Sequence, residues 1–361
     1  MTKRIHARLA DGRDIFYFDD AGSNLAAERA NDSREVTARP DVAQMRLDSI
    51  TGDWVSVAAS RHGRAFLPPA HECPLCPSRP DFASEVPDVF DVAVFENKNP
   101  SFGPDLPAAD DQNFAVEPGL TLGATRSSFG RCEVVVFSSS HEGSFTTLPV
   151  SRVRTIVDAW TDRTSDLLAL PGVRTVFPFE NRGPEIGVTL HHPHGQIYAY
   201  PYVTPTHQKI LNSIAKFGND LFQQTLDFET ASDRLLLKGD NFSAFVPFGA
   251  RWPIELMIMP HRQVGNFTEL SDDEREELAA ITHRVVGSVD RLYDSPTPYV
   301  GGWNQAPKVD GGQNIRFHFR LTSPRRAADK LKYLAGSEAA MGAFIADFPP
   351  EQTAGRLREV L

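Results

Sequence analysis

A cluster of histidines in the middle of the chain has the residue types and the spacing for chemistry at phosphorus. Residues 190–201 read LHHPHGQIYAYP, and residues 195–200 are rich enough in aromatic and β-branched side chains to predict a β-strand. Alternate residues of a strand share a face, so we expect His192, His194 and Gln196 to point the same way.

A neutral imidazole is a suitable nucleophile for phosphorus near pH 7, because its unperturbed pKa is about 6.5. The phosphoramidate that it forms is labile enough for a second phosphate to displace it, which divides one transfer into two steps. Pro193 withdraws a backbone donor and Gly195 removes a side chain, so a ligand can approach the backbone closely. A lone histidine on a strand is usually a core or surface residue, whereas the whole His-Pro-His-Gly-Gln run favours chemistry.

The chain has three cysteines, too few for a disulfide framework in 361 residues. Cys73 and Cys76 have the Cys-x-x-Cys spacing of half a zinc site. By itself this pair also fits a redox role or coincidence. Cys132 lies in an apolar run and is predicted to be a core residue.

An internal repeat determines the predicted architecture. Residues 131–170 and 253–293 each read as a strand, a histidine, a Phe-Thr-x-Leu segment and a helix with apolar residues at intervals of three to four. Ser271 and Glu274 have the spacing of a capping box at the start of the second helix. The copies are offset by 120 to 124 residues, as measured from His141 to His261, Asn181 to Asn304 and His194 to His318.

This repeat predicts an α+β fold of two tandem units, each an antiparallel sheet with helices packed on it. We expect a loosely attached N-terminal arm at residues 1–45, a catalytic unit with the zinc site at 46–205 and a second unit at 206–361. Pro-, Asp- and Ser-rich stretches at 68–87 and 100–112 are predicted loops.

Several of these motifs together resemble those of a known family. The block FENRG, eight further residues and then HPHGQIY resemble the active-site signature of galactose-1-phosphate uridylyltransferases, a branch of the histidine-triad superfamily. The likeness extends from about Asp53 to the C-terminus, with the cysteine pair, His141, the signature and KYLAGSE, which begins at Lys332, in the family's order.

The resemblance implies that His194 is the nucleophile that becomes uridylylated. Gln196 stands where hydrolytic histidine-triad proteins have a third histidine. An amide can donate to and accept from phosphoryl oxygens but cannot activate water as a base, so Gln196 favours holding the intermediate. Asn181, Gly187 and Thr189 match positions around the phosphates of the nucleotide.

Further matches complete the implied substrate site. Arg61, Arg64 and Asn97 correspond to the nucleotide site, although each of these residues alone would pass for an ordinary surface residue. Lys332 and Glu338 correspond to contacts with phosphate and hexose hydroxyls, and in the family this segment comes from the neighbouring subunit of a homodimer.

The resemblance also implies a structural zinc ion held by Cys73, Cys76, His141 and His192. His71 and His191 are rival ligands. Some relatives hold a second metal in the C-terminal unit. Asn304 stands where a histidine is common, so we expect no second metal here.

The implied reaction transfers UMP from UDP-glucose to galactose 1-phosphate, forming UDP-galactose, through a uridylyl-histidine intermediate. One alternative is another nucleotidyltransferase of the superfamily, such as a nucleoside-diphosphate-sugar phosphorylase. A second alternative is a non-catalytic, zinc-containing nucleotide-binding module, against which the intact His194 and Gln196 argue.

Charge and hydropathy limit the partners and the compartment. A formal net charge of -10 argues against general binding of nucleic acid, which needs a basic surface. The sequence contains no run of about 18 apolar residues and no secretory signal, so we expect a cytoplasmic protein without membrane contact.

Overall fold

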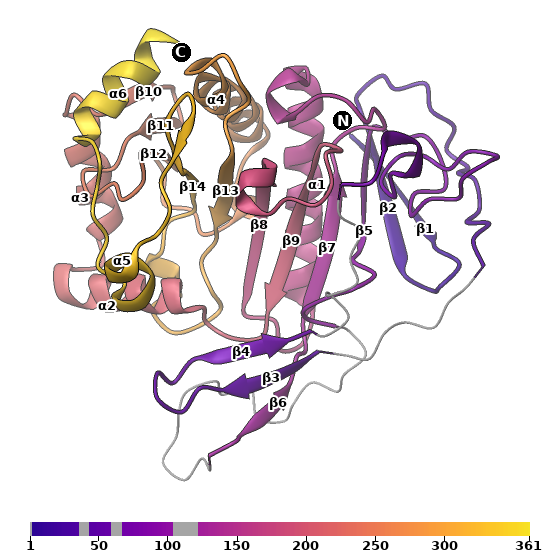
Figure 1. Ribbon diagram of the computed structural model, residues 1–361, viewed down its shortest axis with the longest axis horizontal. Helices are drawn as coiled ribbons and strands as arrows, with labels where there is room; N and C mark the ends of the chain where they lie inside the picture. Colours follow the sequence, from indigo (N-terminus) through magenta and orange to yellow (C-terminus); the bar gives the residue numbers. More distant parts are fainter. Residues whose placement is uncertain (1, 36–42, 59–66, 104–121) are drawn as a thin grey trace.

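One large sheet organises the protein. The computed structural model describes residues 2–35, 43–58, 67–103 and 122–361. Within these ranges, eleven strands form an antiparallel sheet in the order β1-β2-β5-β7-β9-β8-β13-β14-β12-β11-β10 (Figure 1). The first six are β1 (Lys3–Arg8), β2 (Asp14–Asp19), β5 (Val92–Glu96), β7 (Arg131–Val136), β9 (His194–Tyr200) and β8 (Thr175–Arg182). The other five are β13 (Tyr299–Asn304), β14 (His318–Ser323), β12 (Ile254–Pro260), β11 (Phe242–Phe245) and β10 (Leu235–Lys238).

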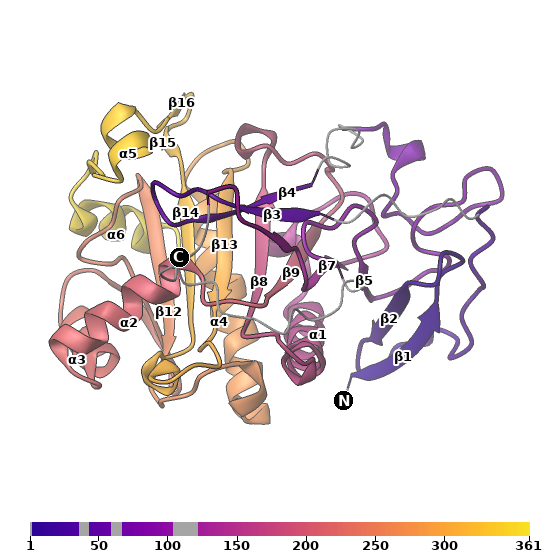
Figure 2. The same cartoon turned by 90° about the horizontal axis from the view of Figure 1, so that it is seen from below.

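Two long helices, α1 (Val150–Ala169) and α4 (Asp272–Arg291), pack together on one face of this sheet (Figure 2). Both match the predicted helices of the repeat. The capping box is confirmed, because the Ser271 hydroxyl accepts from the Glu274 amide and the Glu274 carboxylate accepts from the Ser271 amide. Such a cap contributes about 1 kcal/mol to helix stability.

Shorter elements surround this core. The remaining helices are α2 (Pro205–Phe217), α3 (Leu221–Thr230), α5 (Gly336–Met341) and α6 (Pro350–Glu359). The 3-10 turns are η2 (Ala70–Glu72), η3 (Phe145–Thr147), η4 (Pro184–Ile186), η5 (Phe267–Glu269) and η6 (Gly312–Asn314). Strands β15 (Arg325–Ala327) and β16 (Lys330–Leu331) form a hairpin. In the described part of the chain, no helix is both long and apolar enough to span a membrane.

The two repeated units share their sheet. Strand β8 of the first unit pairs with β13 of the second, from Tyr299 opposite Arg182 to Gly302 opposite Phe179. The side chains of Trp160 and Trp303 meet beneath this seam, in a hydrophobic core that draws on both units. The predicted α+β class and the duplication are therefore confirmed, and the two expected sheets are joined edge to edge as one.

A second, three-stranded sheet lies on the side of the main sheet opposite α1 and α4 (Figure 2). Its strands are β4 (Trp54–Val57), β3 (Gln44–Leu47) and β6 (Thr125–Ser127). Met45 of this sheet packs with Phe102 and with Cys132 of β7, which is fully buried. The prediction that Cys132 is a core residue is confirmed.

The N-terminal segment differs from the expected loose arm. Strands β1 and β2 extend the main sheet, with β2 paired to β5 from Ile15 opposite Phe95 to Phe18 opposite Val92. The DIFYF sequence fills five successive strand positions, of which four are buried. Residues 2–35 are thus part of the folded body, because a strand with apolar residues on both faces is stable only between other layers.

Candidate functional site

Strand β9 carries the histidine motif between β7 and β8. Gln196 lies opposite Phe179 of β8, and partners across an antiparallel pair share a face, so His194, Gln196 and Phe179 lie on one face. Gly195 points to the opposite face and is buried. A Cβ atom there would lie 2.8 Å from the Phe179 carbonyl oxygen and 2.9 Å from the Phe137 ring. Glycine is needed at this position for packing, a different reason from the ligand approach that the sequence suggested.

One hydrogen bond fixes the chemical form of His194. Its Nδ1 atom lies 2.7 Å from the backbone oxygen of His192. A carbonyl oxygen can only accept, so Nδ1 carries the proton and Nε2 keeps its lone pair in the neutral ring. Burial lowers the pKa of His194 below its ordinary value. The neutral imidazole therefore presents a nucleophilic nitrogen.

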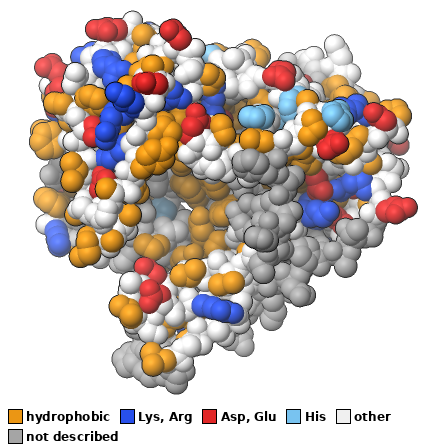
Figure 3. Space-filling view, in the orientation of Figure 1, with side chains coloured by type: hydrophobic (Ala, Val, Ile, Leu, Met, Phe, Trp, Pro, Cys, Tyr) orange, Lys and Arg blue, Asp and Glu red, His pale blue; other side chains and the backbone are white. Residues whose placement is uncertain are grey.

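A cavity of about 600 Å³ lies beside this histidine. Its walls come from the loop after β7, the end of β8, the loop before β9, the loop before β13 and Arg325. His194 and Asn181 line it together with His141 and His192. Several histidine side chains gather on the face drawn in Figure 3. The cavity is large enough for a small ligand with several polar groups.

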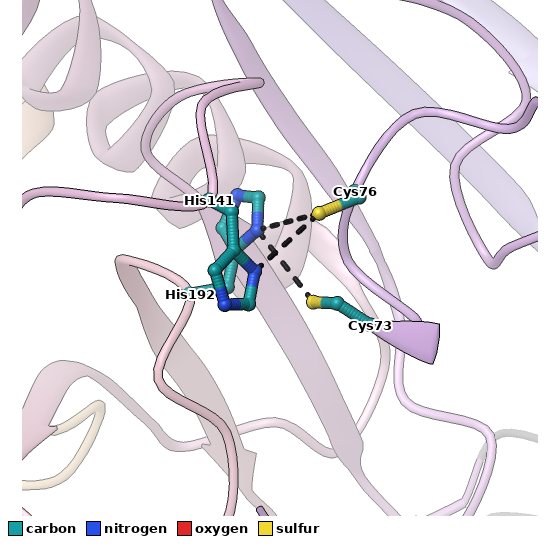
Figure 4. A group of neighbouring side chains, drawn as sticks. All are labelled: Cys73, Cys76, His141 and His192. Atoms are coloured by element: carbon teal, nitrogen blue, oxygen red, sulfur yellow. Dashed lines mark hydrogen bonds between the residues drawn. The ribbon is translucent and has the colours of Figure 1, made fainter. Parts of the chain in front are cut away.

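Cys73, Cys76, His141 and His192 converge on one point although they come from distant loops (Figure 4). The Sγ atom of Cys76 lies 3.5 Å from Nδ1 of both His141 and His192, and Sγ of Cys73 lies 3.7 Å from Nδ1 of His192. All four ligand atoms lie within 4.8 Å of one another. In tetrahedral zinc, bonds of about 2.3 Å to sulfur and 2.0 to 2.1 Å to nitrogen separate S and N by about 3.6 Å. The cluster therefore has the donor set and the spacing of a structural zinc site.

Burial lowers the pKa of His192 to about 4, so its ring is neutral near pH 7 and can serve as a metal ligand. Burial raises the pKa of Cys76 to about 12, so a thiolate at this position needs a compensating positive charge such as a metal ion. Nε2 of His192 donates to the Ser138 backbone oxygen at 2.7 Å, which turns its Nδ1 lone pair toward the sulfurs. The rival ligands His71 and His191 have exposed side chains and lie outside this cluster.

Of the described residues predicted to bind the nucleotide, Asn181 lines the cavity and the others lie outside its lining. Asn181 lines the cavity at the end of β8, and Gly187 lies in the following turn in a left-handed conformation (φ +84°). The Thr189 backbone oxygen accepts a hydrogen bond from the Leu67 amide at 2.8 Å. Asn97 follows β5, where its amide donates to the Cys132 backbone oxygen.

Three further predicted site residues are not among the described residues that line the cavity. Arg61 and Arg64 lie outside the described residues. Gln196 shares the strand face of His194 but does not line the 600 Å³ cavity.

Lys332 and Glu338 do not line the cavity beside His194. Their side chains are buried and form an ion pair of 2.8 Å, and the Glu338 carboxylate also accepts from the Ala335 and Ile345 amides. The hydrogen bond from Lys332 holds the pKa of Glu338 below its ordinary value. Lys332 lines a separate cavity of about 200 Å³. Neither residue lines the cavity of its own chain's His194.

A polar network beside the cavity was not predicted from the sequence. Glu180 accepts a hydrogen bond of 2.7 Å from the Tyr299 hydroxyl, and Arg182 forms an ion pair with Asp290. Burial raises the pKa of Glu180 to about 7. Glu180 and Arg182 belong to the FENRG block, so a signal for them was present. Their partners from the second unit carry no local signal.

Together these features define an enzyme-like α+β protein of two fused units, in which a strand with an oriented histidine runs beside a Cys₂His₂ cluster. Comparison with known proteins gives the family. The model for "Galactose-1-phosphate uridyl transferase, N-terminal domain" matches residues 33–204, and the model for the C-terminal domain of the same family matches residues 204–361. The chain belongs to the galactose-1-phosphate uridyl transferase family, and the prediction of an enzyme of the transferase class is confirmed.

Individual relatives agree with this assignment. A galactose-1-phosphate uridylyltransferase of Streptomyces lividans is 38% identical and is matched over 99% of this chain and 98% of its own length. That of Thermotoga maritima is 34% identical over 88% of this chain and 98% of its own. A solved uridylyltransferase structure superposes with a TM-score of 0.75 at 30% identity, covering 88% of this chain and 98% of that one. An ADP-glucose phosphorylase of Arabidopsis thaliana (TM-score 0.67, 22% identity, 89% of this chain and 99% of that one) shows the fold alone.

Proposed function

We propose that the protein transfers UMP from UDP-glucose to galactose 1-phosphate in two displacements at His194. Nε2 of His194 attacks the α-phosphorus of UDP-glucose, the bond to the β-phosphate oxygen breaks, and glucose 1-phosphate leaves. A phosphate oxygen of galactose 1-phosphate then attacks the uridylyl-histidine. The N–P bond breaks, UDP-galactose leaves and the neutral imidazole is restored.

The hydrogen bond from Nδ1 of His194 to the His192 backbone oxygen is the observation that carries this proposal. This hydrogen bond keeps the proton on Nδ1 and leaves the Nε2 lone pair free, so no general base is needed to activate the nucleophile. It also stabilises the positive charge that the imidazole ring acquires when Nε2 bonds to phosphorus. Gln196 on the same face and Asn181 in the cavity wall supply amide donors for phosphoryl oxygens. The names of the full-length relatives supply the acceptor, galactose 1-phosphate.

A labelling experiment tests the two-step reaction. Protein incubated with UDP-glucose labelled in the uridine should retain about one label per site, and peptide mapping should locate the label on His194. Adding galactose 1-phosphate should release the label as UDP-galactose, whereas inorganic phosphate should release little. Preferential release by inorganic phosphate would favour the phosphorylase alternative. Absence of retained label during active turnover would exclude the covalent route.

We further propose that the four-residue cluster holds zinc. Zinc would supply a fixed tetrahedral link between the Cys73–Cys76 loop and the start of β9, which orients the backbone that holds His194. The match between the sulfur-to-nitrogen separations and tetrahedral zinc supports this assignment.

The segment from Lys332 to Glu338 is proposed to act on the site of a second copy of the chain. Large apolar side chains in and just after this segment are exposed, including Tyr333 (77%) and Met341 (80%), as is typical of a surface that a partner covers. Mixing inactive His194→Ala and Glu338→Ala proteins under verified subunit exchange should restore part of the activity. Hybrids that stay inactive, or a fully active monomer, would contradict the shared site.

A further inference from the structure

The cysteine loop, residues 70–91 between the start of η2 and β5, packs against the N-terminal segment as well as against the catalytic unit. It lies within a separate hydrophobic cluster in which residues of the loop, such as Cys73, Leu75 and Phe90, meet residues of the N-terminal segment, such as Leu9 and Tyr17. In Figure 1 the N-terminal strands and these loops occupy the same edge of the molecule. Residues 2–32 lie before the part of the chain that the family model matches.

A polar network reinforces this packing. The side chain of Arg13 is 0% exposed, and its guanidinium donates to Asp11, to Glu85 and to the Glu96 backbone oxygen. The guanidinium of Arg34 binds the other carboxylate oxygen of Glu85. A fully buried guanidinium must keep its charge, so it requires these acceptors in place. Glu85 is thus held from both sides by arginines of the N-terminal segment.

Short hydrogen-bonded links connect Glu85 to the cysteines. The Glu85 amide donates to the Pro74 backbone oxygen at 3.0 Å, within the Cys-Pro-Leu-Cys sequence itself. The neighbouring Ser84 hydroxyl donates to the Cys76 backbone oxygen at 2.5 Å. Because residues 84 and 85 hydrogen-bond to the backbone of the Cys-Pro-Leu-Cys sequence, fixing the Glu85 side chain also restrains the backbone that positions both sulfur atoms.

Further contacts join the N-terminal segment to the end of the cysteine loop. Arg29 donates to the Val89 backbone oxygen and forms a buried ion pair with Asp19. The Ala30 amide donates to the Asp88 carboxylate at 2.8 Å. The N-terminal segment thus contacts the loop at several points along its length.

We propose that residues 9–34 form a clip that holds the Cys73–Cys76 loop in its metal-binding shape, with Glu85 as the positioning residue that Arg13 and Arg34 grip. This inference rests on the proposed metal centre. Between η2 and β5 the loop contains no α-helix or regular strand, and its internal backbone hydrogen bonds are few, such as those that join Ser78 to Val86 and Arg79 to Phe82. Contacts with the N-terminal segment add to these internal bonds, and a preformed loop retains a metal longer than one that must be ordered at each binding event.

The test measures how easily the loop opens in the full-length protein as purified. Glu85→Gln keeps the shape of the side chain but leaves two arginines without their shared carboxylate. We expect Cys73 and Cys76 to react with a thiol reagent about tenfold faster than in the wild type, as located by peptide mass spectrometry. Release of the bound metal to a chromogenic chelator should accelerate by a similar factor.

Glu229→Gln is the matched control. Glu229 forms a comparably buried ion pair of 2.8 Å with Arg234 in the C-terminal unit and accepts from the Phe248 amide. This variant should lower the melting temperature but leave both rates within about twofold of the wild type. If Glu85→Gln lowers the melting temperature but leaves both rates unchanged, Glu85 has only a general structural role and the clip is refuted.

Two further results are decisive. If Glu85→Gln does not fold, Arg34→Gln takes its place, because Arg13 still holds Glu85. Thiol modification should then be several-fold faster, and an unchanged rate would overturn the clip. If the wild-type protein contains no metal, the proposed metal centre fails, while the rate of thiol modification still tests whether the N-terminal segment holds the loop.

Discussion

His194 and His318 occupy corresponding positions in the two repeated units, and the same hydrogen bond holds both. Nδ1 of His194 donates to the backbone oxygen of the residue two before it at 2.7 Å, and Nδ1 of His318 does so at 2.8 Å. The two rings nevertheless have different surroundings. His194 lines a cavity of about 600 Å³, whereas His318 is 4% exposed and packs against Phe222 of α3. The repeat alone orients a histidine, and the covering elements decide whether a substrate can reach it.

The positions around the second histidine have also been rebuilt. Arg316 and Arg320 stand where the first unit has His192 and Gln196. Arg316 is buried and donates to the Gln263 and Gln223 side chains, and Arg320 forms an ion pair with the fully buried Glu255. In the second unit, the side chains at these two positions are therefore bound to other side chains of the protein.

The residues proposed to bind metal also differ between the two units. His261 corresponds to His141, but Nε2 of His261 contacts the Ser243 hydroxyl at 2.9 Å and Nδ1 contacts the Asp240 backbone oxygen at 3.0 Å. His261 thus makes two hydrogen bonds, whereas His141 lies in a cluster with Cys73, Cys76 and His192. The ring is thus held by protein contacts alone in the second unit, whereas the proposed metal would hold it in the first.

The largest difference should be catalytic. His194→Ala should lower turnover by roughly four orders of magnitude or more and abolish covalent labelling, because the nucleophile is removed. His318→Ala, made in the corresponding residue, should keep turnover within a few-fold and lower the free energy of unfolding by about 1 to 3 kcal/mol. Steady-state assays and urea denaturation of both variants measure this. Near-normal turnover of His194→Ala would remove the distinction between the units.

Loss of a metal ligand should come next. Cys73→Ser should lose most of the bound zinc and melt about 5 to 10 °C lower, because three remaining ligands hold the ion poorly. Ser243→Ala, which breaks the corresponding contact of His261, should cost only about 1 kcal/mol and leave the metal content unchanged. Elemental analysis and thermal melting test both. A Cys73→Ser protein with normal zinc content and melting temperature would contradict the metal assignment.

Glu180 gives a pH-dependent contrast, because Trp303 stands at its position in the second unit. Burial raises the pKa of Glu180 to about 7 from an ordinary value of 4.5, so the folded state binds the proton more tightly than the unfolded state. Its contribution to stability is therefore present at low pH and is lost as the pH rises through about 7.

The variant Glu180→Gln cannot titrate at this position. The free energy of unfolding of the wild type relative to the variant should fall by about 1 to 3 kcal/mol between pH 5 and pH 8. Urea denaturation of both proteins at the two pH values measures this difference. A difference that does not change with pH would show that Glu180 titrates normally.

The smallest expected effect concerns Gln196. Gln196→His should raise the fraction of UDP-glucose that is hydrolysed by roughly tenfold, because a group that titrates near neutral pH replaces an amide beside the intermediate. The ratio of free UMP to UDP-galactose formed reports the partition. An unchanged ratio would mean that the amide does not protect the intermediate, and the contrast with Arg320 would then concern packing alone.

Local patterns in the sequence were sufficient for several features. The 3-to-4-residue apolar spacing and the capping box predicted α4, because a helix start and its buried stripe depend on residues within one or two turns. The alternation of His194 and Gln196 on one strand face was predictable for the same reason. The four-residue Cys and His cluster required the family pattern as well, since its members are up to 119 residues apart.

The pattern of residues along the chain was enough to predict the duplication and the residues that can do chemistry, because both depend on residue type and spacing. Which copy of the repeated histidine is open depends on tertiary contacts, because Phe222 of α3 packs against His318 and nothing near His318 in the sequence encodes that contact. Tertiary contacts also join the two units through β8 and β13 and pack the N-terminal segment against the cysteine loop. These contacts join residues about 60 to 120 positions apart, and their stability depends on burial and ion pairing that arise only when the segments meet.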